Sequence, residues 1–206
     1  MRRRLMMLKK SGGGLPSGYT AVDYLQSSGT QWIEMGVAPN QNTKAVLKIK
    51  INEFTRQGAS LIGSRTDANS NDQFFTYLDY IGGGRFLFRM DGQPETIPWK
   101  GLTTDKIYIV TLSGTEMKAE LEDGTTVFSK TFSVSDFTST VTMALFKSKP
   151  FDNGFRGRIY SCKHYSGDEL IQDFVPCLDT GGVPCMFDLV SRKPFYNVGT
   201  GSFTWG

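Results

Sequence analysis

Short segments in which apolar and polar residues alternate recur along most of the chain. KAVLKIKI (residues 44–51) places an alanine, a leucine and two isoleucines on one face and three lysines on the other, with Val46 as the exception. This period of two predicts a strand with one buried face. Similar segments follow at 106–114, 116–124, 126–132 and 140–148, with turn sequences around Thr115 and Gly124. GDELIQDFV (167–175) is the nearest helix candidate, and it is short. The pattern predicts an all-β, antiparallel sandwich.

One hairpin can be followed residue by residue. QFFTYLDYI (73–81) and RFLFRMD (85–91) flank three glycines. A three-residue loop would place Ile81 opposite Arg85 and fix the register outward from there. The core face would then hold Tyr80, Leu78 and Thr76 opposite Phe86, Phe88 and Met90. The outer face would hold Tyr77, Asp79, Arg85, Arg89 and Asp91.

Charge divides the chain into two unequal parts. The formal charge of the 206 residues is +3, and Arg2, Arg3, Arg4, Lys9 and Lys10 supply 5 of the 23 basic residues. The remainder holds 18 basic against 20 acidic residues, a balance of −2, which excludes the broad basic surface of a nucleic-acid binder. We therefore expect a basic arm with a glycine-rich linker at 1–14, and one domain at 15–206.

The cysteines and the N-terminus bear on where the protein folds. Three cysteines are too few for a disulfide framework. The apolar run at 5–8 falls short of the roughly 7–15 residues of a signal peptide, and no apolar segment is long enough to span a bilayer. We expect folding in a reducing cytoplasm, without membrane contact.

Both ends of the domain carry recognisable segments. These are LPSGYTAVDYLQSSGTQWIEMGVAPN (15–40), GRIYSCKHYSGDELIQDFVPC (157–177) and MFDLVSRKPFYNVGTGSFTWG (186–206). They resemble the concanavalin A-like (laminin-G-like) jelly-roll domains found in phage structural proteins and gut-bacterial surface proteins. The resemblance implies a two-sheet jelly-roll sandwich in which the first and last strands lie side by side. Two places depart from the pattern: His164 replaces an aliphatic residue, and CMFD (185–188) replaces a Gly-Leu-Tyr-Asp-like run.

Catalytic patterns are weak. Glu120, Glu122 and Asp123 lack the spacing of a sandwich glycosidase and run into a turn, which favours surface charge. His164, the only histidine, shares a strand face with Cys162, and both match core-facing family positions. We expect a buried structural histidine and no enzymatic activity.

Metal patterns are incomplete. The three cysteines and His164 lack the paired spacing of a zinc site, which favours small buried thiols. DANSND (67–72) matches the start of a calcium loop but lacks its glycine and its final glutamate. A polar loop is the plainer interpretation. Calcium, at Asp67, Asn69 and Asp72, is the one cofactor that the sequence leaves open.

Polysaccharide binding is the remaining chemistry. Aromatic faces combined with carboxylates and guanidinium groups are suited to sugars. The outer-face residues of the hairpin offer this mixture, and Trp99 is expected nearby. The candidate set is Tyr77, Asp79, Arg85, Arg89, Asp91 and Trp99. An ordinary solvated strand face with cross-strand ion pairs is the alternative.

The family resemblance, the missing secretion signal and the basic arm together predict a non-enzymatic phage virion protein. It would be made in the host cytoplasm and displayed on the particle as a decoration, fiber or tail-associated component. Its arm would contact other virion proteins, and its sandwich could adhere to bacterial surface glycan. A carbohydrate-binding module of a bacterial surface protein is the alternative, and a polysaccharide-cleaving enzyme is a weaker third. Homo-oligomers are compatible with all three.

Overall fold

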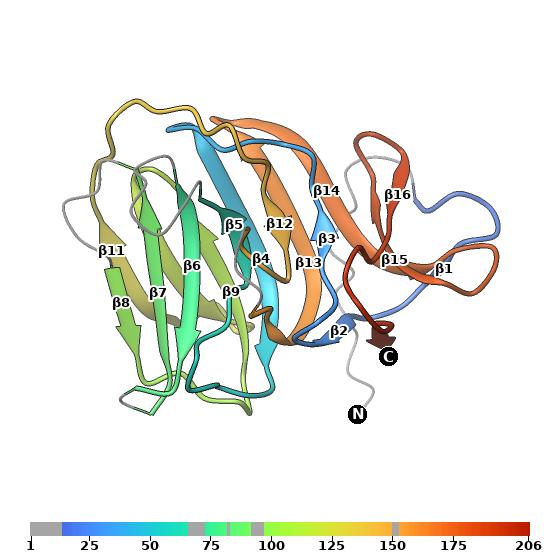
Figure 1. Ribbon diagram of the computed structural model, residues 1–206, viewed down its shortest axis with the longest axis horizontal. Helices are drawn as coiled ribbons and strands as arrows, with labels where there is room; N and C mark the ends of the chain where they lie inside the picture. Colours follow the sequence, from blue (N-terminus) through green and yellow to red (C-terminus); the bar gives the residue numbers. More distant parts are fainter. Residues whose placement is uncertain (1–13, 66–72, 82, 92–96, 150–152) are drawn as a thin grey trace.

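The computed structural model describes residues 14–65, 73–81, 83–91, 97–149 and 153–206. The protein is a jelly-roll β-sandwich of two antiparallel sheets (Figure 1), as the sequence predicts. The described residues form no helix, and therefore none with the length and apolar character needed to cross a membrane.

The larger sheet has eleven strands and carries both ends of the domain. Its main path is β11 (Thr126–Thr131), β10 (Glu116–Leu121), β9 (Ile107–Leu112), β4 (Thr43–Ile51), β13 (Arg156–Ser166), β14 (Glu169–Leu178), β15 (Pro184–Asp188) and β16 (Lys193–Phe195). Three short strands join this path from the side. β1 (Thr20–Ala21) pairs with β14, and β2 (Leu25–Ser28) pairs with both β13 and β17 (Thr204–Trp205).

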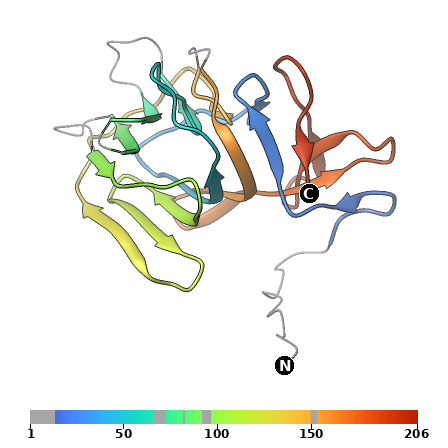
Figure 2. The same ribbon diagram turned by 90° about the horizontal axis from the view of Figure 1, so that it is seen from below.

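The smaller sheet has six strands and covers one face of the larger sheet (Figure 1). Its order is β3 (Ile33–Glu34), β12 (Ala144–Leu145), β5 (Ile62–Ser64), β6 (Phe74–Asp79), β7 (Arg85–Met90) and β8 (Ile97–Lys100). Seen from below, the two layers enclose the interior, while β1, β15 and β16 lie to one side of it (Figure 2).

Alternating burial along the strands forms the core. Every second residue of β4 is buried, and the lysines between them face outward, as predicted. Phenylalanines fill the space between the sheets: Phe146 lies 4.8 Å from Phe203 and 6.4 Å from Phe155, ring centroid to ring centroid. Aromatic side chains bury large apolar areas, so these contacts are a major source of stability.

The two ends of the domain are joined by hydrogen bonds, as the resemblance implied. The backbone N–H groups of Asp23 and Tyr24 donate to the carbonyl of Gly206. Further along, the amide of Gln31 donates to the carbonyl of Thr200 over 3.1 Å, and the N–H of Trp32 donates to Asn197 Oδ1 over 3.0 Å. Residues 27–32 (SSGTQW) thus contact the C-terminal loop, and this contact between the two chain ends is called the seam below.

The β6–β7 hairpin corrects the predicted register. Asp79, not Ile81, lies opposite Arg85, so the loop has five residues and the pairing is displaced by two. An even displacement preserves the faces: Thr76 and Leu78 remain in the core, now opposite Phe88 and Phe86. Tyr80 leaves the predicted core set and is exposed in the loop, and Phe74 takes the place opposite Met90.

One other segment differs from expectation, and the weak helix candidate lies in the β-sheet, as the all-β prediction requires. Only Ala144–Leu145 of segment 140–148 is a strand, because Phe146 adopts a positive φ of 68° that ends the extended run. The helix candidate at 167–175 is instead a turn followed by β14, which continues through Pro176 to Leu178.

Replacing Phe203 tests the aromatic contact between the C-terminal loop and Phe146. Phe203→Ala removes a fully buried ring that touches Phe146, so we expect the free energy of unfolding to fall by about 3–5 kcal/mol. Chemical denaturation would measure the change. Val198→Ala, at a side chain that is 57% exposed, is the control and should change stability little. Equal effects of the two variants would contradict this account of the seam.

Candidate functional site

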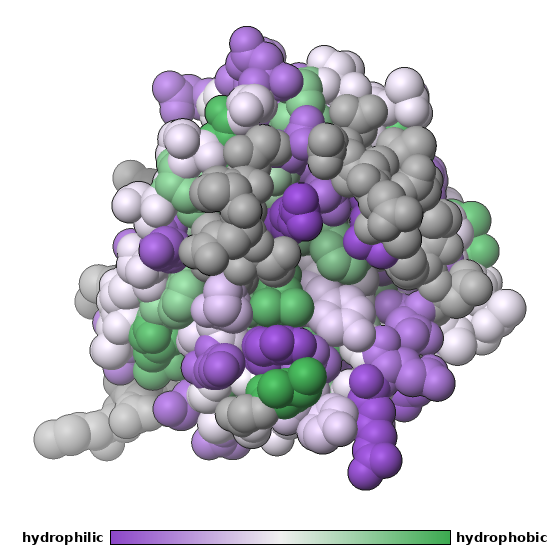
Figure 3. Space-filling view, turned by 60° about the vertical axis from the view of Figure 1, so that its left-hand side comes forward, coloured by the Kyte–Doolittle hydropathy of each residue, from purple (hydrophilic) through white to green (hydrophobic). Residues whose placement is uncertain are grey.

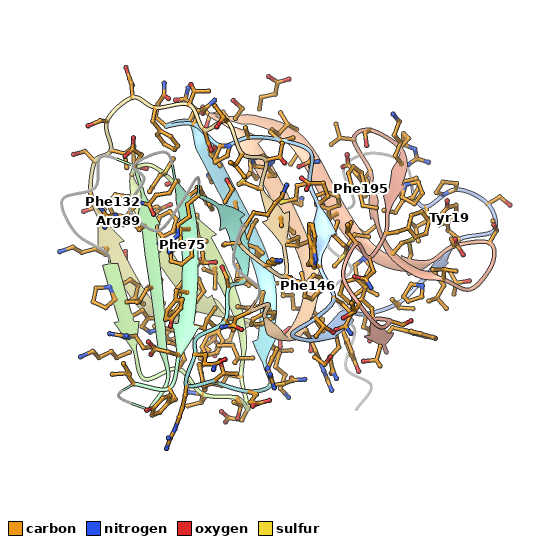
Figure 4. All side chains as sticks on the ribbon, viewed as in Figure 1. Tyr19, Phe75, Arg89, Phe132, Phe146 and Phe195 are labelled. Carbon is orange, nitrogen blue, oxygen red and sulfur yellow. The ribbon has the colours of Figure 1, made fainter. Side chains whose placement is uncertain are left out.

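Aromatic and arginine side chains meet on the outer face of the smaller sheet. Phe75 and Tyr77 project from the same side of β6, with ring centroids 6.1 Å apart. Arg89 on β7 is the direct cross-strand partner of Phe75, and both are labelled in Figure 4. The guanidinium carbon of Arg65 lies 4.5 Å from the centroid of the Phe75 ring, within cation–π range. This group, Arg65, Phe75, Tyr77 and Arg89, is called the outer-face cluster below.

Tyr77 is fixed in place by the loop before β5. Its hydroxyl donates to the backbone carbonyl of Gln57 over 3.0 Å, and its ring lies against Gly58. A Cβ at Gly58 would come within 2.0 Å of Tyr77 Cζ, and the φ of this glycine is +71°. Both facts require glycine here, so the sequence of the loop decides how the ring is presented.

A groove of about 520 Å³ opens beside Tyr77 at the end of the sandwich. It is lined by Gly29, Thr30, Glu53, Phe54, Thr55, Arg56, Gln57, Gly58, Asn153, Gly154 and Arg156. A smaller pocket of about 80 Å³ shares Gln57, Gly58 and Asn153 with the groove and extends to Tyr77 and Phe75. The groove and the outer-face cluster therefore form one continuous surface.

Some of the polar groups along the groove are hydrogen-bonded to one another. Arg156 Nη1 donates to Glu53 Oε2 over 3.0 Å, and Asn153 Nδ2 donates to the carbonyl of Gln57 over 3.3 Å. The guanidinium of Arg56 lies over the ring of Tyr80, 5.8 Å from its centroid. Within the described part of the chain, the buried Nε of Arg89 has no hydrogen-bond acceptor. The surface thus offers guanidinium, amide and aromatic groups together.

Asp79 and Arg85 pair with each other at the start of the hairpin loop. Arg85 Nε donates to Asp79 Oδ1 over 3.1 Å, and Arg85 Nη2 donates to the other carboxylate oxygen. The N–H of Ile81 also donates to Asp79, which is 3% exposed. The hydrogen bonds with Asp79 raise the pKa of Arg85. The Asp79–Arg85 pair fixes the start of the loop. It is one of the cross-strand ion pairs expected if this strand face is an ordinary solvated one.

Trp99 is wrongly placed by the sequence-based prediction. β8 pairs with β7 so that Trp99 lies opposite Phe86, and its ring packs inward against Phe86, Tyr108 and Phe128. Only 5% of this residue is exposed, so it belongs to the core and cannot meet a ligand. Asp91 follows the end of β7, half-buried, and its N–H donates to the carbonyl of Gln73.

The remaining surface on this side is mixed in character. With the left-hand side of Figure 1 turned forward, hydrophilic and hydrophobic described residues are interspersed rather than gathered into one patch (Figure 3). Glu120 and Glu122 pair with Lys118 and Lys48, at 2.8 and 2.7 Å, on the larger sheet. These carboxylates are thus surface charges at the β10–β11 hairpin, as predicted.

The predicted calcium residues Asp67, Asn69 and Asp72 lie outside the described residues, as do the basic residues of the arm. Among the described residues, no cluster of three or more histidine, cysteine or acidic side chains could hold a metal ion. All three cysteines are buried free thiols, as the sequence suggested.

His164 is a buried structural residue. Its Nδ1 donates to Gln172 Oε1 over 3.0 Å, and Gln172 Nε2 in turn donates to the carbonyl of Met35 over 2.9 Å. Burial lowers the pKa of His164, against the smaller opposing effect of its bond to Gln172. Burial also raises the pKa of Cys162 far above its usual range. A neutral, hydrogen-bonded imidazole and a protonated thiol do not form a nucleophilic site.

Three members of this surface escaped the sequence analysis: Arg65, Phe75 and the loop at 53–58. Phe75 has the same strand parity as Tyr77, so the alternation alone could have included it. The loop has no comparable signal, because its approach to Tyr77 exists only in the folded protein.

Comparison with solved structures places this architecture among known sandwiches. A Bacteroides ovatus protein whose proposed role is carbohydrate binding matches with a TM-score of 0.60 and 12% identity, over 90% of this chain and 60% of that chain. A pentraxin from Limulus polyphemus (TM-score 0.45, 14% identity, 74% and 76%) and mouse laminin α1 domains LG4–5 (0.49, 12%, 100% and 51%) also match.

The chain thus spans about 60% of the length of the B. ovatus structure. No protein-family model matches the sequence, and no curated protein matches it. At 12% identity the B. ovatus comparison shows a shared fold, that of a concanavalin-like jelly roll.

The histidine gives a pH test. Between its lowered folded pKa and the unfolded value of about 6.5, the unfolded chain binds a proton that the folded chain does not. The free energy of unfolding should therefore fall as the pH falls through this window. We expect His164→Gln to lose less stability than the wild type between about pH 7.5 and about pH 5 in denaturant titrations. Identical pH dependence of the two proteins would contradict a buried neutral His164.

Proposed function

We propose that the protein is a non-catalytic polysaccharide-binding protein, and that it binds along the outer-face cluster and the adjoining groove. The observation that carries this proposal is the position of Tyr77, whose ring is held against Gly58 where the two surfaces meet. The proposed carbohydrate binding of the B. ovatus protein that shares the fold supports it.

The chemistry of the surface suits a sugar chain. The C–H face of a pyranose packs on aromatic rings, and its hydroxyls need donors and acceptors at fixed positions. Phe75 and Tyr77 supply adjacent rings on one strand. Arg56, Asn153 and Gln57 supply hydrogen-bonding groups in the groove beside them. An open groove that continues onto a sheet face admits an extended chain rather than a small, enclosed ligand.

Binding without cleavage is favoured by the acid content of the groove. Glycosidases place two carboxyl groups on either side of the scissile bond, about 5–9.5 Å apart. Of the described residues that line the groove, Glu53 is the only acid, and it is paired with Arg156. This arrangement supports retention of a polysaccharide in unchanged form.

A polysaccharide panel tests the proposal. Binding of the full chain to neutral and acidic bacterial polysaccharides would be measured by affinity electrophoresis or calorimetry. Tyr77→Ala and Arg89→Ala should each weaken binding about tenfold, the loss expected from about 1.4 kcal/mol of contact energy.

Tyr165→Ala is the matched control, because Tyr165 lies on the other sheet beneath Lys44. Its binding should equal that of the wild type, and all variants should keep the circular dichroism spectrum of the wild type. Absence of binding to every polysaccharide, or equal losses in the control, would overturn the proposal.

We further propose that the domain is carried on a phage particle and that residues 1–14 attach it there. The supporting observation is the separation of charge: a basic arm of five lysines and arginines precedes a body with a balance of −2. Such an arm is suited to an acidic surface of another virion protein. A bacterial surface protein that carries the same sugar-binding domain is the alternative.

Deletion of residues 1–14 distinguishes the phage-particle proposal from the bacterial surface-protein alternative. We expect the truncated protein to keep its denaturation midpoint, because the strands begin at Thr20, and to be absent from purified particles. Replacement of the five basic residues of the arm by serine should have the same effect, which would assign attachment to charge. Particles that incorporate the truncated protein at full occupancy would contradict the attachment role.

A further inference from the structure

Two of the three cysteines face each other outside the main core. Cys177 on β14 and Cys185 on β15 are direct cross-strand partners, and their Sγ atoms are 3.5 Å apart. They form a second, smaller cluster with Phe187 and Leu189. Cys162 belongs to the core between the sheets instead.

The backbone already has the geometry that a disulfide needs. Directly opposed residues of an antiparallel pair have Cα atoms about 4.5–5.5 Å apart, inside the range that disulfides occupy. The two sulfurs have to approach by about 1.5 Å to reach bonding distance. A small change of side-chain torsion would achieve this approach, so the finished disulfide would fit the strands in their present positions.

The turn beside the pair holds this geometry. The N–H groups of Gly181 and Val183 donate to Asp179 Oδ1 over 2.8 and 2.9 Å, and the hydroxyl of Tyr196 donates to Asp179 Oδ2 over 2.9 Å. The N–H of Asp179 donates to the carbonyl of Val183, which closes the hairpin. The two cysteines thus stand two residues from a fixed turn.

We propose that Cys177 and Cys185 are a modification site, at which a low-molecular-weight disulfide such as oxidised glutathione converts the two thiols into an intrachain disulfide. The Cys177 thiolate attacks the oxidant and forms a mixed disulfide, which releases one glutathione thiol. Cys185, after loss of its proton, then attacks Cys177 Sγ, and the second glutathione leaves as a thiol. Two protein thiols are oxidised, and one oxidant disulfide is reduced.

The two thiols differ in a way that assigns these roles. The hydrogen bond that Cys177 shares with Cys185, together with a backbone hydrogen bond from Phe187, lowers the pKa of Cys177, so Cys177 is the better source of thiolate. The shared hydrogen bond raises the pKa of Cys185, which fits the resolving position. Both side chains are buried, so oxidation proceeds through local opening of the hairpin end.

The bond would lie where the N-terminal segment packs against the sandwich. Cys177 is the pairing partner of Ala21 on β1, and Leu15 and Tyr19 pack against the cysteine cluster. Tyr19, labelled in Figure 4, lies 5.1 Å from Phe187, ring centroid to ring centroid. A cross-link here joins β14 to β15 beside the segment that follows the arm, in an oxidising surrounding and not in a reducing one.

The test uses the folded full chain. It is incubated with oxidised or reduced glutathione, then unfolded in acid, alkylated and weighed. We expect three alkylated cysteines after reduction and one, Cys162, after oxidation, with a peptide that links Cys177 to Cys185. Cys162→Ser is the matched control and should form the same link. Three alkylated cysteines after oxidation, or a link that includes Cys162, would overturn the proposal.

Single variants test the order of the steps. Cys185→Ser should accumulate a glutathione adduct on Cys177, because the resolving thiol is missing, whereas Cys177→Ser should gain little adduct on Cys185. The oxidised wild type should unfold at a higher denaturant concentration than the reduced protein, and Cys185→Ser should show no such increase. An adduct that forms only on Cys185 would contradict the assigned roles, and an unchanged midpoint would contradict stabilisation of the hairpin by the disulfide.

Discussion

The mutual burial of two apolar sheet faces is the constraint on which the other features of this molecule depend. Each sheet is apolar on one side because its strands alternate, and neither side can remain in water. The phenylalanines between them come from β6 and β7 of the smaller sheet and from loops beside the strands: Phe74, Phe86, Phe88, Phe146, Phe155 and Phe203. β13 shows how far the constraint reaches, because it pairs with β4, β14 and β2 and so gathers the N-terminal, central and C-terminal parts of the chain.

The proposed binding surface lies on the face of β6 and β7 that does not pack against the other sheet. Residues on this side of β6 and β7 lie outside the core between the sheets. Phe75, Tyr77 and Arg89 lie on this side, whereas Thr76 and Phe88 between them fill the interior. The loop at 53–58 lines the groove that adjoins this face, and Gly58 allows the loop backbone to touch the Tyr77 ring. The proposed recognition and the folding thus involve different residues of the same strands.

Sequence patterns predicted those parts of the fold that depend on alternation. The buried face of β4 and the inward and outward sides of the β6–β7 hairpin follow from strand parity. The joined chain ends followed from a family resemblance, and the seam at Gln31 and Trp32 confirms them. The hairpin register did not follow, because three consecutive glycines suggested the loop length while the Asp79–Arg85 pair determines it. The position of Trp99 depends on how β8 pairs with β7, and no local pattern encodes that pairing.

The five-residue loop between β6 and β7 has a consequence for how such a domain can change over evolutionary time. Lengthening or shortening this loop by two residues slides one strand along the other but keeps the inside and the outside of the sheet distinct. A change by one residue would exchange them and expose the core. The loop beside the proposed binding groove can therefore vary in paired steps while the scaffold is inherited intact.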